Sequence, residues 1–305
     1  MIKRTLYFGN PAYLSLKLKQ LVVRLPKQED DERDEEELTR TVPIEDIGVI
    51  ILDHKQITVT QALLGELLGN NCAVITCDSR QLPAGLMLPL SGNTVQNERF
   101  RLQIDASLPL KKQLWQQTIE AKIRNQAAML HYTTGDIHKN MLKWSESVKS
   151  GDVENMEARA AVYYWKSLFP DNPYFVRDHE GGGANALLNY GYAILRAIVA
   201  RALVASGLLP TLGIHHHNRY NAYCLADDIM EPYRPYVDKI VFDILTEDSQ
   251  ASITVANKIK LLNIPVTEVV IGGRRSPLVV AVSHITTSLV KCFRGESRRL
   301  TYPEM

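Results

Sequence analysis

Hydrophobic and polar residues alternate near the start of the chain, as they do in strands with one buried face. In LSLKLKQLVVRL, the residues Leu14, Leu16 and Leu18 fall on one side and polar residues fall on the other. Further apolar runs typical of strands lie in VPIEDIGVIILD (42–53), CAVITCD (72–78) and GLMLPL (85–90). Leucines at helical spacing in QALLGELLGN predict one helix at 61–70. Residues 1–90 are therefore predicted to form a small β-sheet domain with one helix.

From residue 91 onward the hydrophobic residues recur with the period of an α-helix. The segment KKQLWQQTIEAKIRNQAAMLHY carries Leu114, Ile119, Ile123 and Leu130 in this pattern, and NERFRLQIDAS before it is also free of helix breakers. Further helices are predicted at 153–168, 184–206, 221–237, 250–261 and 276–294, with Gly and Pro at the joints. The expected fold class is α+β, in which the β domain is followed by a larger all-α catalytic domain at 91–305.

The composition is that of an ordinary globular protein. The chain has 305 residues, of which 45% are hydrophobic and 23% are charged. The sequence has no run of about 18 apolar residues and no apolar N-terminal stretch, so we expect no membrane span and a cytoplasmic location. Four scattered cysteines do not suit a disulfide framework or a cysteine zinc site. The glycine-rich loops of common nucleotide-binding folds are missing from the sequence.

The net charge of +1 hides an uneven distribution. Residues 29–37 (EDDERDEEE) carry eight acids and one base, which leaves +8 on the other 296 residues. A neutral total is therefore compatible with a basic working surface, although it does not establish one. The acidic run itself has the composition of a solvated hairpin tip.

Three segments of the helical part contain candidate metal ligands. The first is Glu157 in NMEARAAVYYW, where Ala158, Ala160 and Ala161 leave room for another helix to approach. Such an approach would place the carboxylate in a crevice. The alternative is an ordinary exposed helix acid, because acids are rarely buried without partners.

The second segment is the histidine run at 213–217, Gly-Ile-His-His-His, between two predicted helices. Neutral imidazole is a common ligand of divalent metals, but three adjacent histidines cannot all point at one ion. The alternative is a surface loop that happens to contain histidines.

The third segment is acidic and reads Asp227-Asp228-Ile229-Met230-Glu231. On a helix Glu231 shares a face with both aspartates, where like charges repel by a few tenths of a kcal/mol and a cation would remove that penalty. The alternative is a solvated acidic face or a helix cap, and Pro232 predicts a kink or a helix start nearby. If the three segments meet, their mixed oxygen and nitrogen donors suit Mg²⁺ or Mn²⁺ better than structural zinc.

Longer motifs around these segments resemble a known family. RDHEGGGANALLNYGYAILRAIVARALVASGLLPTLGIHHHN and LADDIMEPYRPYVD are similar to the CRISPR-associated integrase, the universal subunit that inserts spacers into CRISPR arrays. The form with Glu231 is most similar to members from type II systems. The resemblance covers the whole chain, and it implies a β domain followed by a larger helical domain.

The resemblance also implies a metal site. The family's glutamate falls on Glu157, its histidine on His216, and its acid before the Pro-aromatic-Arg-Pro segment on Glu231, where many members carry Asp. Asp228 matches a second acid that is often found near the metal. The implied ion is Mg²⁺ or Mn²⁺. Because three histidines adjoin, His215 and His217 remain alternatives to His216.

The implied activity is DNA strand transfer and, with water, DNA cleavage. The 3′-OH ends of a short double-stranded DNA fragment attack phosphodiesters at the two sides of a CRISPR repeat. The implied partners are DNA, a second copy of the chain through the β domain, a small ferredoxin-like adaptation subunit and the type II effector nuclease. A non-catalytic DNA-binding scaffold and a stand-alone nuclease for branched DNA are the alternatives.

Candidate DNA-binding residues are basic or aromatic. Arg177 and Arg234 lie nearest the motifs, and Tyr13 or Tyr7 is a candidate for stacking on an end base. Each has an ordinary structural alternative as a solubilising charge or a sheet residue. Basic residues that flank the domain junction are Arg99, Arg101, Lys111 and Lys112, and others are Arg274, Arg275, Arg294, Arg298 and Arg299.

Overall fold

A computed structural model describes residues 3–27, 38–172 and 174–305. The chain divides into two compact units, Met1–Gly92 and Asn93–Met305. This division lies close to the boundary expected after residue 90. The acidic run at 29–37, for which a hairpin tip is expected, lies outside the described residues.

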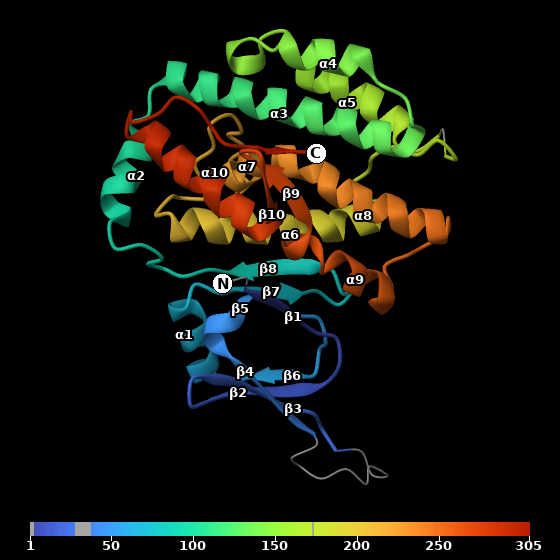
Figure 1. The fold of residues 1–305 in the computed structure, drawn as a ribbon. Helices are drawn as coiled ribbons and strands as arrows, with labels where there is room; N and C mark the ends of the chain where they lie inside the picture. Colours follow the sequence, from blue (N-terminus) through green and yellow to red (C-terminus); the bar gives the residue numbers. More distant parts are fainter. Residues whose placement is uncertain (1–2, 28–37, 173) are drawn as a thin grey trace. The chain divides into compact units, whose positions relative to one another are not determined.

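The first unit contains two four-stranded sheets (Figure 1). One sheet has the order β1-β5-β7-β8, with the first three strands parallel and β8 antiparallel. Its strands are β1 (Arg4–Phe8), β5 (Ile47–Leu52), β7 (Ala73–Cys77) and β8 (Pro83–Met87). The other sheet has the order β4-β3-β2-β6, with β4 (Thr39–Pro43), β3 (Gln20–Arg24), β2 (Ala12–Lys17) and β6 (Ile57–Val59). A single 3-10 turn, η1 (Ile44–Asp46), precedes β5. The alternation of polar and apolar residues predicted the β2–β3 pair, whereas β1 was not predicted.

One residue of the β2–β3 hairpin departs from the predicted pattern. Leu18 was expected to share the buried face of Leu14, but its side chain is 87% exposed. Leu18 and Lys19 form the two-residue turn and both have positive φ angles, 48° and 59°. Such turns match the twist of the two strands, so the chain reverses at Leu18 instead of extending through it.

The predicted helix of the first unit is α1 (Gln61–Gly69), and it closes the core. The Thr60 hydroxyl accepts a hydrogen bond from the Leu63 backbone N–H and caps the helix start. Leu63 and Leu67 then pack into one apolar cluster with residues such as Leu14 and Ile50 from the two sheets. The two sheets and the helix therefore share a single core.

The second unit is mainly helical, as the sequence predicted for the larger domain. Its helices are α2 (Gln96–Ile104), α3 (Leu108–Thr134), α4 (Lys139–Glu146), α5 (Met156–Ser167), α6 (Ala184–Ala205), α7 (Cys224–Met230), α8 (Arg234–Glu247), α9 (Val255–Leu261) and α10 (Leu278–Phe293). Its described residues also form the 3-10 turns η2 (Ser150–Asp152), η3 (Glu231–Tyr233) and η4 (Ile264–Val266). Helix α4 was not predicted.

Helix α6 forms the centre of this unit and contacts α7, α8 and α10 (Figure 1). By length and mean hydropathy it would be apolar enough to cross a membrane, but 72% of its apolar window is buried inside the protein. This burial is what a core helix of a folded domain shows.

The single helix predicted at 221–237 is three consecutive elements. Helix α7 ends at Met230, the turn η3 spans Glu231–Tyr233, and α8 continues to Glu247. Pro232 and Pro235 occupy first-turn positions of η3 and α8, where a missing N–H costs least. The break expected near Pro232, as a kink or a helix start, is therefore present, since α7 ends just before it and α8 starts just after it.

The prediction of an all-α second domain was wrong in one detail. A small antiparallel sheet of order β10-β9-β11 is formed by β9 (Glu268–Ile271), β10 (Arg274–Pro277) and β11 (Pro303–Glu304). Gly272 and Gly273, expected at a joint, form the two-residue turn between β9 and β10 with φ angles of 56° and 73°. Two consecutive glycines allow this turn because both central residues need positive φ.

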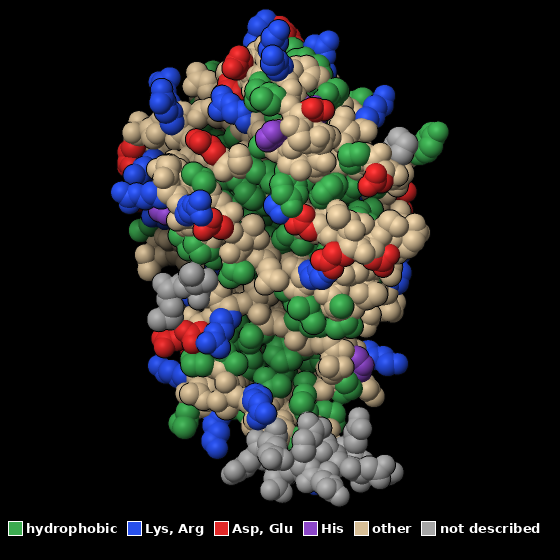
Figure 2. Space-filling view, turned by 45° about the vertical axis from the view of Figure 1, so that its right-hand side comes forward, with side chains coloured by type: hydrophobic (Ala, Val, Ile, Leu, Met, Phe, Trp, Pro, Cys, Tyr) green, Lys and Arg blue, Asp and Glu red, His purple; other side chains and the backbone are tan. Residues whose placement is uncertain are grey.

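Charged side chains are mixed on the face of the helical unit that Figure 2 shows. Lys and Arg side chains are interspersed there with Asp and Glu, and the basic side chains do not form a continuous patch on this face. The described part of this face therefore shows no basic surface of the kind that binds nucleic acid.

Candidate metal centre

Glu157 lies in the first turn of α5, and a buried aspartate fixes the start of that helix. The Asp152 carboxylate accepts hydrogen bonds from the backbone N–H groups of Met156 (2.8 Å) and Glu157 (3.0 Å). The Glu157 side chain is 23% exposed and points towards α3, against which α5 packs. The carboxylate therefore lies in a partly buried crevice, as the small neighbouring residues suggested.

The histidine segment is a tight turn folded around one buried carboxylate. Asp228 is completely buried and accepts hydrogen bonds from the backbone N–H groups of Ile214 (2.7 Å) and His215 (2.9 Å). Gly213 permits this closeness, because a Cβ atom there would lie 2.4 Å from the His216 carbonyl oxygen and 2.8 Å from Asp228 Oδ2. The turn can form only with glycine at this position.

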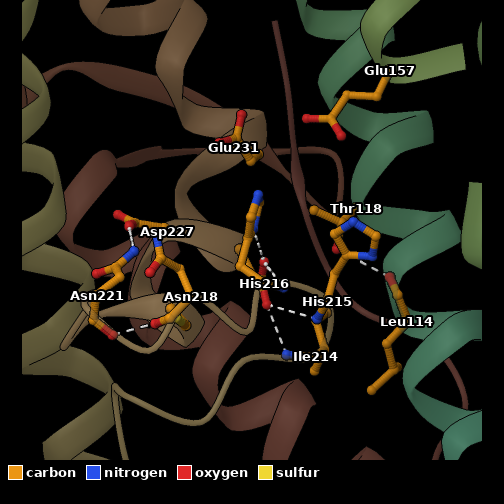
Figure 3. A network of polar contacts seen from close by, with 12 residues as sticks. Leu114, Thr118, Glu157, Ile214, His215, His216, Asn218, Asn221, Asp227 and Glu231 are labelled. Carbon is orange, nitrogen blue, oxygen red and sulfur yellow. Dashed lines mark hydrogen bonds and ion pairs between the residues drawn. The ribbon is translucent and has the colours of Figure 1, made fainter. Parts of the chain in front are cut away.

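The geometry distinguishes the three histidines. His215 stacks face to face on Trp115, with ring centroids 4.1 Å apart, and His217 is exposed. His216 binds Asp228 Oδ1 through Nδ1 at 2.5 Å, which leaves its Nε2 edge pointing towards Glu231 and Glu157 (Figure 3). The hydrogen bond and charge of Asp228 raise the pKa of His216 despite partial burial, and both glutamates add to the effect.

Burial lowers the pKa of His215, and the neighbouring His216 adds to the effect. His215 thus packs flat on an aromatic ring, and it is His216 whose free ring nitrogen faces the glutamates. Of the three histidines, His216 is the one placed to act together with Glu157 and Glu231.

Each acid of the Asp227–Glu231 segment has partners of its own, so their mutual repulsion is compensated without a shared ion. Asp227 binds Arg196 at 2.6 Å and Asn221 at 2.7 Å. Asp228 holds the histidine turn, and Glu231 binds the Arg234 side chain at 2.9 Å. Of the two aspartates, neither is directed at Glu157.

A lysine joins the two glutamates. The Lys122 ammonium lies 2.6 Å from Glu157 Oε1 and 2.6 Å from Glu231 Oε2, and its side chain is only 10% exposed. The bond to Glu157 has hydrogen-bond geometry, whereas Glu231 Oε2 is buried and contacts the ammonium as an ion pair only. Two carboxylates from distant segments therefore meet at one buried cation.

Electrostatics keeps these groups charged. Burial raises the pKa of Glu231, but Arg234 and Lys122 outweigh burial and bring it down to about 2. Burial likewise lowers the pKa of Lys122, but the two glutamates outweigh it and raise the pKa above its ordinary value. At neutral pH Glu231 is therefore a carboxylate, Lys122 an ammonium and Arg234 a guanidinium.

All three segments rest against one face of helix α3. Trp115 stacks on His215, and Lys122 binds both glutamates. Asn125 donates to the carbonyl oxygens of Pro232 (2.7 Å) and Pro303 (3.0 Å) and so holds the turn that carries Glu231. Thr118, Lys122 and Asn125 are four and three residues apart, so they share this face.

Sequence reasoning missed this face of α3. The signal was nevertheless present, because Thr118, Lys122 and Asn125 are polar residues at helical spacing within a helix whose other buried positions are mostly apolar. Buried polar residues at such spacing indicate a partner across the interface, since a buried polar group without one is costly.

The donor set fits a divalent cation, but the ligands do not stand in a ready-made arrangement. Two carboxylates and an imidazole are the oxygen and nitrogen donors that Mg²⁺ and Mn²⁺ accept. Among the described residues, no three His, Cys, Asp or Glu side chains are grouped closely enough to hold an ion as they stand. A basic side chain, Lys122, is instead bound between the glutamates, and it shows that the position attracts a cation.

Comparison with known proteins identifies the family. The model of the family described as CRISPR associated protein Cas1 matches residues 6–254. The chain belongs to the Cas1 family. A Cas1 endonuclease from Neisseria meningitidis is 40% identical over 245 residues, which cover 80% of this chain and 76% of the relative. Another from Francisella tularensis subsp. novicida is 29% identical over 76% of each chain.

Solved structures share the fold. A casposase bound to an integration product matches with a TM-score of 0.78 and 20% identity, covering 98% of this chain and 92% of the other. A Cas1 protein from Thermotoga maritima matches with a TM-score of 0.69 and 15% identity, over 96% and 97% of the two chains. A chain of a Cas6-RT-Cas1–Cas2 complex matches with a TM-score of 0.76 and 18% identity, over all of this chain and 36% of the other. The α+β order predicted from the sequence is therefore that of Cas1 structures.

Two of the predicted DNA-binding arginines of this Cas1 chain are structural neighbours of the site. Arg234 and Arg177 lie on the Tyr192 ring, 4.6 Å and 5.5 Å from its centroid. Arg177 also donates to the side chains of Asn185 and Asn189. Their guanidinium groups are thus already engaged inside the protein, and DNA contact through them stays a prediction.

The remaining candidates differ in exposure. Arg99 donates to the Ser206 carbonyl oxygen at 2.7 Å, Lys111 is half-buried, and Arg101 and Lys112 are exposed. In the β unit, Tyr13 is 54% exposed on β2. Its alternative, Tyr7, is half-buried and donates to Asp53 at 2.5 Å, so Tyr13 is the freer of the two aromatic rings.

Proposed function

We propose that this chain is a divalent-metal-dependent DNA integrase and endonuclease of CRISPR spacer acquisition. Membership of the Cas1 family supports the activity, and so do the relatives named endonucleases and a fold shared with a casposase bound to an integration product. The observation that carries the proposal is the meeting of Glu157 and Glu231 at one buried cation, with the free edge of His216 directed at them.

The proposed reaction is a transesterification. A 3′-OH end of a short DNA fragment loses its proton and attacks a phosphodiester of the CRISPR repeat, and a new bond forms between that oxygen and phosphorus. The bond from phosphorus to the strand's own 3′ oxygen breaks, and that oxygen leaves as a hydroxyl after taking up a proton. One phosphodiester replaces another, so no ATP is needed. Water in place of the 3′-OH gives strand cleavage.

Glu157, Glu231 and the Nε2 atom of His216 would hold Mg²⁺ or Mn²⁺. Such an ion, when bound, polarises the phosphate and stabilises charge on the attacking and leaving oxygens. Asp228 is a positioning residue in this proposal, because its oxygens are already bound to the turn and to His216 Nδ1. A carboxylate behind the ligating histidine fixes the ring's tautomer and direction.

Other residues keep the glutamates in place. Asp152 fixes the first turn of α5 and with it Glu157. Arg234 binds one oxygen of Glu231 at 2.9 Å, and Asn125 holds the carbonyl oxygen of the next residue, Pro232. The site is thus held by groups that do not themselves need to touch DNA, as preorganised sites require.

An assembly of several chains follows from the chemistry. The two 3′ ends of one fragment must attack two phosphodiesters that lie a repeat apart, so two sites at a fixed separation are needed. We propose a homodimer through the β unit, a small ferredoxin-like partner subunit, and a further contact with the effector nuclease of a type II system. The fold shared with a chain of a Cas1–Cas2 complex supports the small partner. The assembly would act in the cytoplasm.

The test is strand transfer of a DNA fragment into a supercoiled plasmid that carries a repeat, with Mg²⁺ or Mn²⁺ and the partner subunit. Glu157→Gln, His216→Ala and Glu231→Gln are each expected to abolish the product while circular dichroism shows a folded protein. Glu154→Gln is the matched control, since Glu154 is an exposed acid that pairs with Lys149 outside the site. Full activity of Glu157→Gln would refute the proposal.

Two alternatives have distinct outcomes in the same assay. A non-catalytic scaffold binds DNA equally well in EDTA and gives no product under any condition. A stand-alone nuclease for branched DNA gives the same activity with and without the partner subunit. The proposed integrase requires both the metal ion and the partner for full-length insertion.

A further inference from the structure

The ammonium of Lys122 lies where the two glutamate ligands of the proposed metal site face each other. It is 2.6 Å from an oxygen of each glutamate, and its side chain is 10% exposed. A divalent ion held by the same two oxygens would need nearly the same place. The ammonium and the ion therefore cannot both keep these contacts.

Burial strengthens the contact between the ammonium and the two glutamates. Glu231 is itself buried, and Lys122 is the one charged side chain among the buried residues of α3. Without a cation, Glu157 and Glu231 would repel each other at low dielectric, where charge interactions are larger than in water. The lysine therefore keeps the glutamates close together in the protein free of metal.

The Lys122 side chain is also able to move away from the two glutamates. Its four methylene groups are flexible, and its backbone is held in the middle of the 27-residue helix α3. Glu157, at the outer side of the pair, is 23% exposed, so the crevice is open to solvent on that side. The ammonium can leave the glutamates by side-chain rotation alone, without movement of the helix.

We propose that Lys122 is an exchangeable counter-ion of the metal site, which holds Glu157 and Glu231 together in the metal-free protein and is displaced when Mg²⁺ or Mn²⁺ binds. The inference rests on the proposed function and goes beyond it, because it assigns Lys122 a role. The displacement weakens metal binding, since the ion must replace an existing ion pair. It also explains why the described ligands are near one another without forming a closed set.

The test compares Lys122→Met with wild type in the full-length protein, without DNA. Binding of Mn²⁺ is measured by electron paramagnetic resonance of the free ion, and the melting temperature is measured in EDTA and in Mn²⁺. We expect Mn²⁺ to bind at least about tenfold more tightly to Lys122→Met, equivalent to about 1.4 kcal/mol. Its melting temperature is expected to be lower in EDTA and to rise more on addition of Mn²⁺.

Two further variants make the result decisive. Lys149→Met removes the ammonium that pairs with Glu154 outside the site, and it is expected to change neither quantity. Lys122→Gln, which keeps a hydrogen-bond donor without the charge, serves if Lys122→Met does not fold in either buffer. It is expected to show the same direction of change in Mn²⁺ affinity.

Unchanged or weaker Mn²⁺ binding by the folded Lys122 variants would overturn the exchange and make Lys122 a fixed structural residue. That outcome is distinct from failure of the proposed function. If the proposed function fails, wild type itself binds no Mn²⁺, and Glu157→Gln behaves like wild type in both measurements.

Discussion

At the scale of single residues, the proposed metal site depends on one buried carboxylate that is not itself a proposed ligand. Asp228 accepts three backbone N–H groups and the His216 ring, so it determines where the imidazole points. The adjacent acid, Asp227, makes no contact with this turn and is held by Arg196 and Asn221. The two neighbouring aspartates thus provide a natural pair for comparison.

Asp228→Asn is expected to weaken Mn²⁺ binding by about 10–100-fold, because groups that orient a metal-ligating histidine typically contribute this much. The amide cannot accept all four hydrogen bonds, so the turn loosens as well. Isothermal titration with Mn²⁺ measures the change, and Asp227→Asn is the control expected to retain wild-type affinity. Equal affinities for the two variants would remove Asp228 from the site.

At the scale of the elements, the start of α5 is coupled to the position of Glu157. Asp152→Ala removes the acceptor of two backbone N–H groups, so the free energy of unfolding should fall by about 0.5–2 kcal/mol. Thr254→Ala removes a similar cap from α9, away from the site, and should cost a similar amount. Urea denaturation measures both effects.

Mn²⁺ titration then separates the two caps. Only Asp152→Ala should weaken Mn²⁺ binding, because only this cap orients a proposed ligand. If both variants bind Mn²⁺ like wild type, the first turn of α5 is held by its packing on α3 and the cap is dispensable for the site.

A second prediction at this scale concerns Asp238, which joins three helices. Asp238 on α8 accepts hydrogen bonds from Tyr164 on α5 and Tyr192 on α6. Burial raises its pKa from 3.8 to about 6, although the two tyrosines act in the opposite direction. Because the folded pKa is the higher one, the folded state binds more protons than the unfolded state between these values, and stability falls as pH rises.

The contribution of Asp238 to the free energy of unfolding should therefore be complete below about pH 4 and decrease by on the order of 3 kcal/mol up to about pH 7. Urea denaturation of wild type and Asp238→Asn over this range measures it as a difference. The advantage of wild type over Asp238→Asn should shrink as pH rises. Asp243→Asn, on the same helix but partly exposed, controls for surface acids. A difference that grows with pH would contradict the assignment.

At the scale of the whole molecule, every proposed ligand lies in the unit Asn93–Met305. The three tryptophans of the chain, Trp115, Trp144 and Trp165, lie in the same unit. Mn²⁺ at about 100 times its dissociation constant should stabilise that unit by about 2.7 kcal/mol. The thermal midpoint followed by tryptophan fluorescence should rise accordingly, and Glu157→Gln should show no rise.

The sequence alone predicted the order of the two units and most of the helices, because hydrophobic periodicity is a local signal. It also placed Glu157, His216 and Glu231 in three candidate segments, although the residues themselves left His215 and His217 open. The stacking of His215 on Trp115 depends on a contact across about 100 positions of sequence, which no local pattern encodes.

The missed features share that cause. Lys122 reads as an ordinary helix lysine until two distant glutamates meet it, and β11 pairs with β9 only after the end of the chain returns to it. The kink at Pro232 was predictable because proline restricts its own backbone.

The balance of charge around Lys122 has one more consequence for the complete reaction. Glu157 and Glu231 are matched by Lys122 and Arg234, so the free cluster has little attraction for a polyanion. A divalent ion in place of the Lys122 ammonium would give the cluster one net positive charge, and the local field would then favour phosphate. By thermodynamic linkage, DNA would in turn strengthen ion binding, so each ligand would raise the affinity of the protein for the other.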